Sequence, residues 1–548
     1  MTRLASFVDR TDAIVPTAQL DDAHVGDIMG AFGTLNPNRA DARPAWRRRL
    51  TTLLAIVGPG LIVMVGDNDA GAFGTYTQAG QNYGTSLLWT LLLLVPVLYV
   101  NQEMVLRLGA VTGVGHARLI FERFGRFWGA FSIIDLFLLN ALTIVTEFIG
   151  VSLGLDYLGL PKFWGVVLAA VAVIGAASTG RFQRFERFMM VLVFGSLLLV
   201  PVVLTVHPPV GQIAHDFFVP GLPQGGKLSD VMLLIIAVVG TTVAPWQLFF
   251  QQSYIVDKRI GPRFIPYEKI DLWLGIVLVI VGAVAIMAFT AAAFAGTAGF
   301  GQFTDAAMVA HGLEAHSGRF MGVLFAITLI DASIIGAGAV SLSTAYAIGD
   351  VFKVRHSLHH RPGEAVGFYF IFAGLIAVAA ALVLVPGTPL GLLTNAVQTL
   401  AGVLLPSATV FLLLLCNDEA VLGPWRNGPW LNLFTGAVIA VLVMLSVILT
   451  VSVVFPDIGS IFILTVLGGG TAATIGAWFI SAAASHNRHA PIDRRGRRDW
   501  RMPPLSNLQR PKMALRERAW MAVLRLYLLA AAGLVLFRIV QLALTRNG

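Results

Sequence analysis

The chain has 548 residues, of which 56% are hydrophobic and only 12% are charged. Soluble domains carry about 25% charged residues, so this composition excludes an ordinary soluble enzyme and a disordered chain and predicts a polytopic membrane protein. The net charge of +8 does not indicate binding to nucleic acid, because the basic residues lie in short connections between apolar runs, where the positive-inside rule places them.

Residues 1–50 are polar, and we expect them to form a flexible cytoplasmic N-terminal arm. They lack the apolar core of a cleaved signal peptide. Apolar runs that are long enough to cross a bilayer follow the arm. They are 51–78, 86–107, 130–155, 161–178, 188–206, 230–255, 270–296, 320–348, 366–386, 389–416, 431–454, 459–483 and 519–542. Arg47, Arg48 and Arg49 precede the first run, and every second connection after it is basic, which places the N-terminus in the cytoplasm.

The first run carries two carboxylates, Asp67 and Asp69, near its centre, where a charge costs several kcal/mol. Gly66 and Gly71 flank them and weaken the helix at this point. We therefore expect a break here, with Asp69 facing a cation. On a regular helix Asp67 would point away from Asp69, and only unwinding after Gly66 lets both face one ion or its water shell. The alternative for Asp67 is a hydrogen bond to backbone amides.

The sixth run is interrupted by Gly240 and Pro245. The backbone carbonyl of Thr241, just before this proline, is free to meet a cation, although the threonine hydroxyl can also bond to the preceding turn. Gln247 lies either in the water shell of an ion or in helix packing. In the tenth run, Gln398 is either a ligand or a partner in an interhelical hydrogen bond.

Breaks in the first and sixth spans indicate an inverted repeat with a substrate site between two discontinuous helices. We expect an all-α membrane protein with an inverted five-plus-five helix repeat, like that of the amino acid–polyamine–cation transporters, plus extra C-terminal spans. The expected units are a first repeat (51–206), a second repeat (207–416), additional spans (417–484), a basic cytoplasmic connection (485–518) and a last span (519–548).

Other classes of membrane protein fit the sequence less well. A membrane-embedded enzyme needs a nucleophile with a base, or metal-binding histidines, inside the spans, but the histidines lie in or near predicted loops and Cys416 is the only cysteine. We therefore predict no enzyme and no cofactor. An amino-acid transporter of the same architecture would hold a substrate carboxylate at the breaks, which Asp67 and Asp69 would repel. The two carboxylates favour a cation as the substrate; the other predicted partner is the lipid bilayer, and no protein partner is predicted.

The first two runs resemble those of the Nramp family of divalent-metal transporters. The resemblance rests on the stretch from Gly58-Pro59-Gly60 to Gln78-Ala79-Gly80, on Tyr83-Gly84 and on Leu87-Leu88-Trp89. The family carries Asp-Pro-Gly-Asn in its first span. The resemblance implies that Asp69 matches the metal-binding aspartate and that Gly71 keeps the glycine. Ala70 and Ala72 then replace the proline and the asparagine.

In its sixth span the family carries Met-Pro-His, often followed by Asn. The resemblance implies that Pro245 keeps the proline, whereas Ala244, Trp246 and Gln247 replace the methionine, the histidine and the asparagine. Gly71, Ala72, Ala244 and Pro245 would form the two helix breaks.

Three further matches concern the ion and the proton route. Thr241 falls where the family offers a carbonyl to the ion, and Gln398 falls on the family's third metal-contacting helix. Glu147 matches a glutamate of the proton route, but Ile144 replaces the neighbouring aspartate.

These replacements change which metals the site favours. Ala244 offers no thioether, which is the soft ligand that favours manganese and iron, and the oxygen ligands that remain suit Mg²⁺, Ca²⁺ or Mn²⁺. The pattern is similar to the magnesium-transporting branch of the family. We expect Mg²⁺ transport by alternating access, with Mn²⁺ also carried and without proton coupling, because proton relays need chains of titratable groups. The alternative is a proton-coupled Mn²⁺/Fe²⁺ transporter of the ordinary Nramp type. The expected location is a prokaryotic plasma membrane.

Overall fold

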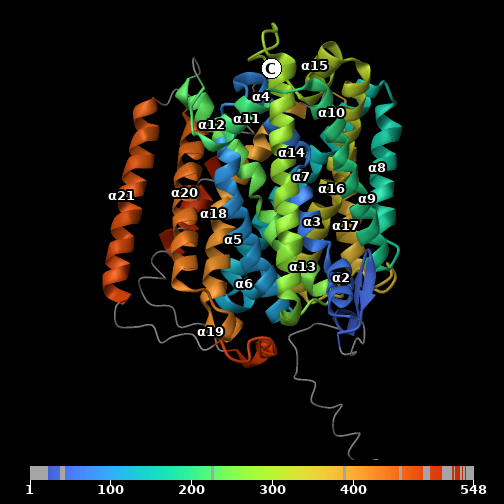
Figure 1. The fold of residues 1–548 in the computed structure, drawn as a ribbon. Helices are drawn as coiled ribbons and strands as arrows, with labels where there is room; N and C mark the ends of the chain where they lie inside the picture. Colours follow the sequence, from blue (N-terminus) through green and yellow to red (C-terminus); the bar gives the residue numbers. More distant parts are fainter. Residues whose placement is uncertain are drawn as a thin grey trace, which may run out of the picture.

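The computed structural model describes residues 22–37, 44–223, 227–386, 390–455, 459–485 and 494–508, and parts of 521–537. They form a bundle of helices with a small hairpin at one end (Figure 1). The elements are η1 (Asp22–His24), β1 (Ile28–Gly30), β2 (Gly33–Leu35), α2 (Ala45–Ile56), α3 (Pro59–Val65), α4 (Ala70–Tyr83), α5 (Trp89–Thr112), α6 (His116–Phe124), α7 (Arg126–Leu158), α8 (Lys162–Ala177), α9 (Phe182–Gly195), η2 (Ser196–Leu198), α10 (Leu199–Val206), α11 (Val210–Phe218), α12 (Leu228–Thr242), α13 (Pro245–Asp257), η3 (Pro262–Phe264), α14 (Ile265–Phe294), α15 (Ala306–Ser317), α16 (Arg319–Phe352), α17 (Val366–Leu384), α18 (Leu390–Asn417), α19 (Glu419–Leu422), η4 (Gly423–Trp425), α20 (Pro429–Val454), α21 (Ser460–Ser485) and η5 (Leu505–Asn507).

Many of these helices are apolar enough to cross a membrane. In the described part of the chain, eight helices have the length and composition of a span, and up to ten spans result if each bent pair counts as one. This is fewer than the number of apolar runs in the sequence. One reason is that α8 has only 16 residues, fewer than the roughly 20 that a span needs. Half of the last predicted run, 519–542, lies outside the described residues.

Residues 22–37 and 44–50 of the N-terminal arm are folded, which corrects the prediction that residues 1–50 are flexible throughout. β1 and β2 pair antiparallel, and α2 begins at Ala45. The turn between the strands is fastened to α9. Ala31 N donates to Glu186 Oε2 at 2.5 Å, and Arg187 Nε donates to Ala31 O at 2.9 Å. The sequence does not reveal these contacts, because they join residues that are far apart in the chain.

Two helices are interrupted near the middle of the bundle. Residues 66–69 separate α3 from α4, and residues 243–244 separate α12 from α13. The two broken helices run in opposite directions, because α3 leads upward into α4 in Figure 1 whereas α12 leads downward into α13. Further contacts join the two, since α13 packs on α3 and α12 packs on α4. The breaks fall at the two aspartates and just before Pro245, as predicted, but Gly71 and Ala72, which were expected to form the first break, lie in the first turn of α4. The antiparallel pairing of the two broken helices is the arrangement expected of an inverted repeat.

A third interruption was not predicted. α2 and α3 are bent by 47° at Val57 and Gly58, and Gly58 has φ +153°, a conformation that other residues rarely adopt. Lys258, at the end of α13, holds this bend: its Nζ donates to Ile56 O at 2.6 Å and to Val57 O at 3.0 Å. The bend therefore depends on a buried side chain that comes from the other broken helix.

Candidate metal site

Asp69 is the last residue of the first break and directly precedes α4. Its backbone is extended, and its Oδ1 accepts a hydrogen bond from Ala72 N at 2.9 Å, so it is the N-cap of α4. The side chain is buried. A helix N-terminus favours a negative charge at this position.

Asp67 is fully buried and faces the second broken helix. Its Oδ1 accepts a hydrogen bond from Gln247 Nε2, whereas its Oδ2 has no hydrogen-bond partner among the described residues. Gln247 Oε1 accepts in turn from Gln102 Nε2 at 3.0 Å. The structure thus brings the predicted residues Asp67 and Gln247 into contact and leaves one carboxylate oxygen available for a ligand.

Glu147, on α7, approaches the first break from another side. Its Oε2 accepts from Ala70 N at 3.2 Å, whereas its Oε1 is buried and has no hydrogen-bond partner among the described residues. Glu147 therefore brings a second carboxylate with an unpartnered oxygen to the first break. Gly336 on α16 makes room for the Glu147 carboxyl group, because a Cβ at Gly336 would lie 2.6 Å from Glu147 Cδ.

The break in the second helix leaves a backbone carbonyl without its usual partner. Inside a helix the carbonyl of Thr241 would accept from the N–H of residue 245, but that residue is Pro245, which has none. Ala244 is the N-cap of α13 and makes no side-chain cap bond. Thr242 Oγ1 donates to Val238 O at 2.6 Å and accepts from Tyr76 OH at 2.7 Å, which joins α12 to α4.

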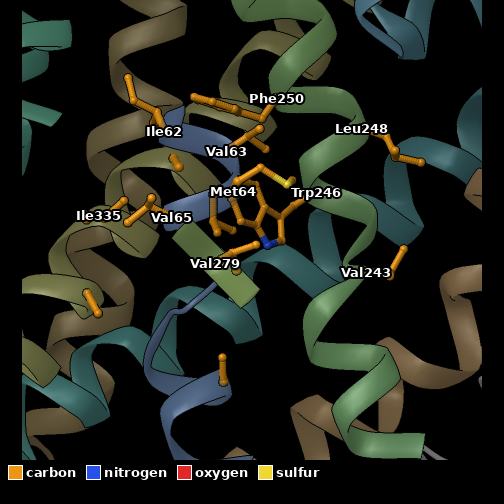
Figure 2. Packing of buried hydrophobic residues seen from close by; sticks show 14 of the residues in the cluster. Ile62, Val63, Met64, Val65, Val243, Trp246, Leu248, Phe250, Val279 and Ile335 are labelled. Atoms are coloured by element: carbon orange, nitrogen blue, oxygen red, sulfur yellow. The ribbon is translucent and has the colours of Figure 1, made fainter. Parts of the chain in front are cut away.

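Trp246 packs against the first break and belongs to its wall. The indole is 1% exposed and lies beside Met64 and Val65 of α3 (Figure 2). Its ring reaches to 3.6 Å from the position that a Cβ on Gly66 would take. The backbone carbonyl of Trp246 accepts from Ser343 Oγ at 2.9 Å, which ties α13 to α16.

The remaining predicted residues give less information. Gln398 lies within α18, and its side chain is outside the part that the structure describes. Within the described ranges, no group of three or more histidine, cysteine, aspartate or glutamate side chains is arranged to hold a metal. A cation at the breaks would therefore be held by one or two carboxylates together with amide and backbone oxygens, or through water.

Gln102 was not singled out from the sequence. It lies on α5 within the polar triplet Asn101-Gln102-Glu103, at the end of an otherwise apolar run, and that triplet is the signal that could have pointed to it. Through Gln247 it extends the hydrogen bonding from Asp67 to a third helix.

Comparison with known proteins assigns the chain to a family. The model of the Nramp family, described as natural resistance-associated macrophage protein-like, matches residues 60–452. The chain belongs to the Nramp family. Nramp proteins are transporters and not enzymes, and they need no bound cofactor, so these predictions are confirmed, as is the multi-pass membrane location.

Curated Nramp relatives match most of the chain. A protein of Latilactobacillus sakei named divalent metal cation transporter MntH is 25% identical over 425 residues, covering 74% of this chain and 90% of the relative. A protein of the same name from Klebsiella pneumoniae is 26% identical over 403 residues, covering 72% and 93%.

A solved structure shares the fold. A variant of the Eremococcus coleocola manganese transporter superposes with a TM-score of 0.62 at 20% identity, covering 83% of this chain and 97% of that one. The likeness confirms the predicted transporter fold with its inverted repeat.

Proposed function

We propose that this Nramp protein moves divalent metal cations across the membrane, with Mg²⁺ as the preferred substrate and Mn²⁺ also carried. The observation that carries the proposal is the capped, buried Asp69 at the meeting point of two broken helices. The names of the curated relatives, divalent metal cation transporters, support the same class of substrate. The division into repeats at 51–206 and 207–416 is part of this proposal.

The preference for Mg²⁺ rests on the kind of ligand at the breaks. The groups that could bind a metal at the breaks all do so through oxygen: Asp69, the unpartnered oxygen of Asp67, the Thr241 carbonyl and the Gln247 amide. Ala244, at the start of α13, contributes no ligand atom. Oxygen ligands suit Mg²⁺, which also keeps several of its waters when it binds. Sulfur ligands favour softer metals. We place Gln398 in the same set as a direct or water-mediated ligand.

Ala244→Met tests the role of the missing thioether. The variant places sulfur at the start of α13, so we expect uptake of Cd²⁺, a soft ion, to rise by about 10-fold relative to that of Mg²⁺, equivalent to about 1.4 kcal/mol. Ala244→Leu, which adds similar volume without sulfur, is the matched control. Uptake ratios measured in proteoliposomes that remain equal in the two variants would argue against a hard oxygen site.

We further propose alternating access without coupled proton movement. Trp246 and Ile144 replace titratable residues of the family and are buried in packing that cannot carry protons. One observation favours the alternative, a proton-coupled Mn²⁺/Fe²⁺ transporter: the buried Glu147 carboxyl group lies at the first break with its Oε1 unpartnered, where it can take up and release a proton.

Glu147→Gln separates these two mechanisms. In the uncoupled mechanism Glu147 only positions the break through Ala70 N, a bond that glutamine can keep. We then expect Mg²⁺ uptake to change less than about 10-fold and to depend on external pH no more than in the unmodified protein. Uptake that loses a pH dependence present in the unmodified protein would instead show that Glu147 releases a proton during transport.

A further inference from the structure

A cavity of about 190 Å³ lies beside the first break, away from the carboxylates of the candidate metal site. The polar residues of the break face different partners: Asp67 bonds to Gln247 of α13 and Asp69 caps α4, whereas Asn68 donates to Val279 O of α14 at 3.1 Å. Asn68 also lines the cavity, which continues between η2, α10, α14 and α16. The cavity therefore touches the unwound segment without touching Asp67 or Asp69.

The polar side chains that line this cavity offer several hydrogen-bond acceptors. Asn68 donates one amide N–H to Val279 O, and its Oδ1, on a side chain more than nine-tenths buried, has no partner among the described residues. Ser196 and Thr328 each donate their hydroxyl proton to a carbonyl in the preceding turn of the chain, at 2.7 and 2.8 Å. These three side chains present acceptor lone pairs that a ligand with N–H or O–H donors can use.

Asp331 on α16 adds a negative charge to this lining. Its Oδ2 is buried and has no hydrogen-bond partner in the described part of the chain. Its Oδ1 lies 2.4 Å from where a Cβ on Gly195 would be, so the glycine at the end of α9 provides the space that the carboxylate occupies. An unpaired carboxylate at membrane depth is costly and calls for a cationic partner.

The rest of the wall is apolar and reaches the outer surface of the bundle. Leu197, Val200, Leu204 and Val281 line the cavity and are about half exposed or more, on helices that the bilayer surrounds. The opening therefore faces the lipid. A bare metal ion would leave most of this apolar volume unfilled, whereas a ligand with a hydrocarbon body would fill it.

We propose that this cavity binds a hydrophobic primary ammonium ion that enters from the bilayer. The ammonium group carries three N–H donors and one positive charge, which match the Asp331 carboxylate, Asn68 Oδ1 and a hydroxyl oxygen. The hydrocarbon chain lies along α10 and α14. A ligand in this place holds the unwound segment against α10 and α16, and so inhibits transport without competing with the metal. The inhibition rests on the proposed function, whereas the binding does not.

Binding is tested with hexylamine, which is protonated at neutral pH, and with 1-hexanol, a neutral ligand of nearly the same shape. The whole protein in lipid nanodiscs is heated at increasing ligand concentrations, and the unfolding midpoint gives the apparent Kd. We expect hexylamine to raise the midpoint to a plateau and hexanol to have no effect. Asp331→Asn should weaken hexylamine binding at least about 10-fold, the worth of a charge-assisted hydrogen bond.

Two further variants serve as controls. Asp135→Asn removes another carboxylate at membrane depth, one that bonds to Ser407 Oγ, and should leave hexylamine binding unchanged. Ala285→Leu narrows the cavity without changing any charge and should weaken binding, which keeps the test valid if Asp331→Asn does not fold.

Three results would overturn the proposal. The first is that hexanol raises the unfolding midpoint as much as hexylamine does, and the second is that hexylamine binds Asp331→Asn and Ala285→Leu as tightly as the unmodified protein. The third is that Na⁺ or Mg²⁺, but not hexylamine, raises the unfolding midpoint in a way that depends on Asp331. The last would make this an inorganic cation site. Hexylamine binding in a protein that takes up no divalent metal would instead leave the site standing and refute the proposed function.

Discussion

Replacing Asp69 by Asn is expected to abolish divalent-cation uptake while the protein stays folded. Asn is as good an N-cap as Asp, so it can keep the bond to Ala72 N, but it carries no charge. Attraction between a cation and a buried carboxylate is worth more than about 3 kcal/mol, so uptake into proteoliposomes should fall at least about 100-fold. Asp69→Ala should also abolish uptake and in addition lower stability by about 1 kcal/mol through loss of the cap.

Asp305 provides the matched control for this prediction. It is also an N-cap, accepting from Met308 N at 2.9 Å, but it begins α15 in a connection between spans. Asp305→Asn should change neither uptake nor stability noticeably. If Asp69→Asn transports at the rate of the unmodified protein, the charge at the break is not needed and the candidate site is wrong.

The second large effect concerns Lys258, whose replacement by Met should strongly destabilise the fold. Its Nζ donates to Glu186 Oε1 at 2.7 Å and to the carbonyls of Ile56 and Val57, and neither side chain of the ion pair is exposed. Removing the lysine leaves Glu186 Oε1 and two carbonyls without this donor and leaves the buried carboxylate without its cation, although Glu186 Oε2 keeps the bond from Ala31 N. Breaking a buried ion pair in this way costs about 3–5 kcal/mol. The unfolding midpoint in nanodiscs measures the loss.

Two comparisons show whether this loss comes from the buried pair. Glu186→Gln combined with Lys258→Met removes the unpaired charge and should recover part of the stability. Arg263→Met breaks the exposed pair with Asp499, in which both side chains are more than half accessible, and should cost at most about 1 kcal/mol. Equal losses for Lys258→Met and Arg263→Met would show that burial of the pair contributes nothing.

The sequence predicts the two central helix breaks because their causes are local. Gly66, the two aspartates and Pro245 each act on the helix in which they lie, through backbone freedom, capping or a missing N–H. The contact between Asp67 and Gln247 follows from these breaks once two inverted helices meet. That these residues bind the metal stays a prediction.

The features that the sequence does not reveal depend on long-range contacts. The hairpin before α2 is held by Glu186, and the bend at Gly58 is held by Lys258. Polar residues in the first part of the chain suggested flexibility, because a strand pair this short has no stability of its own and needs a surface to pack on. Gln102 reaches the site only because α5 lies beside α13.

Ion uptake into proteoliposomes tests the account most directly, with a magnesium-sensitive dye and a pH dye trapped inside. An inside-negative potential should drive Mg²⁺ in, because two charges gain about 4.6 kcal/mol per 100 mV. We predict Mg²⁺ influx that disappears in Asp69→Asn and is not accompanied by internal acidification. Absence of Mg²⁺ entry, together with Mn²⁺ entry that acidifies the interior, would contradict the account and identify a proton-coupled manganese transporter.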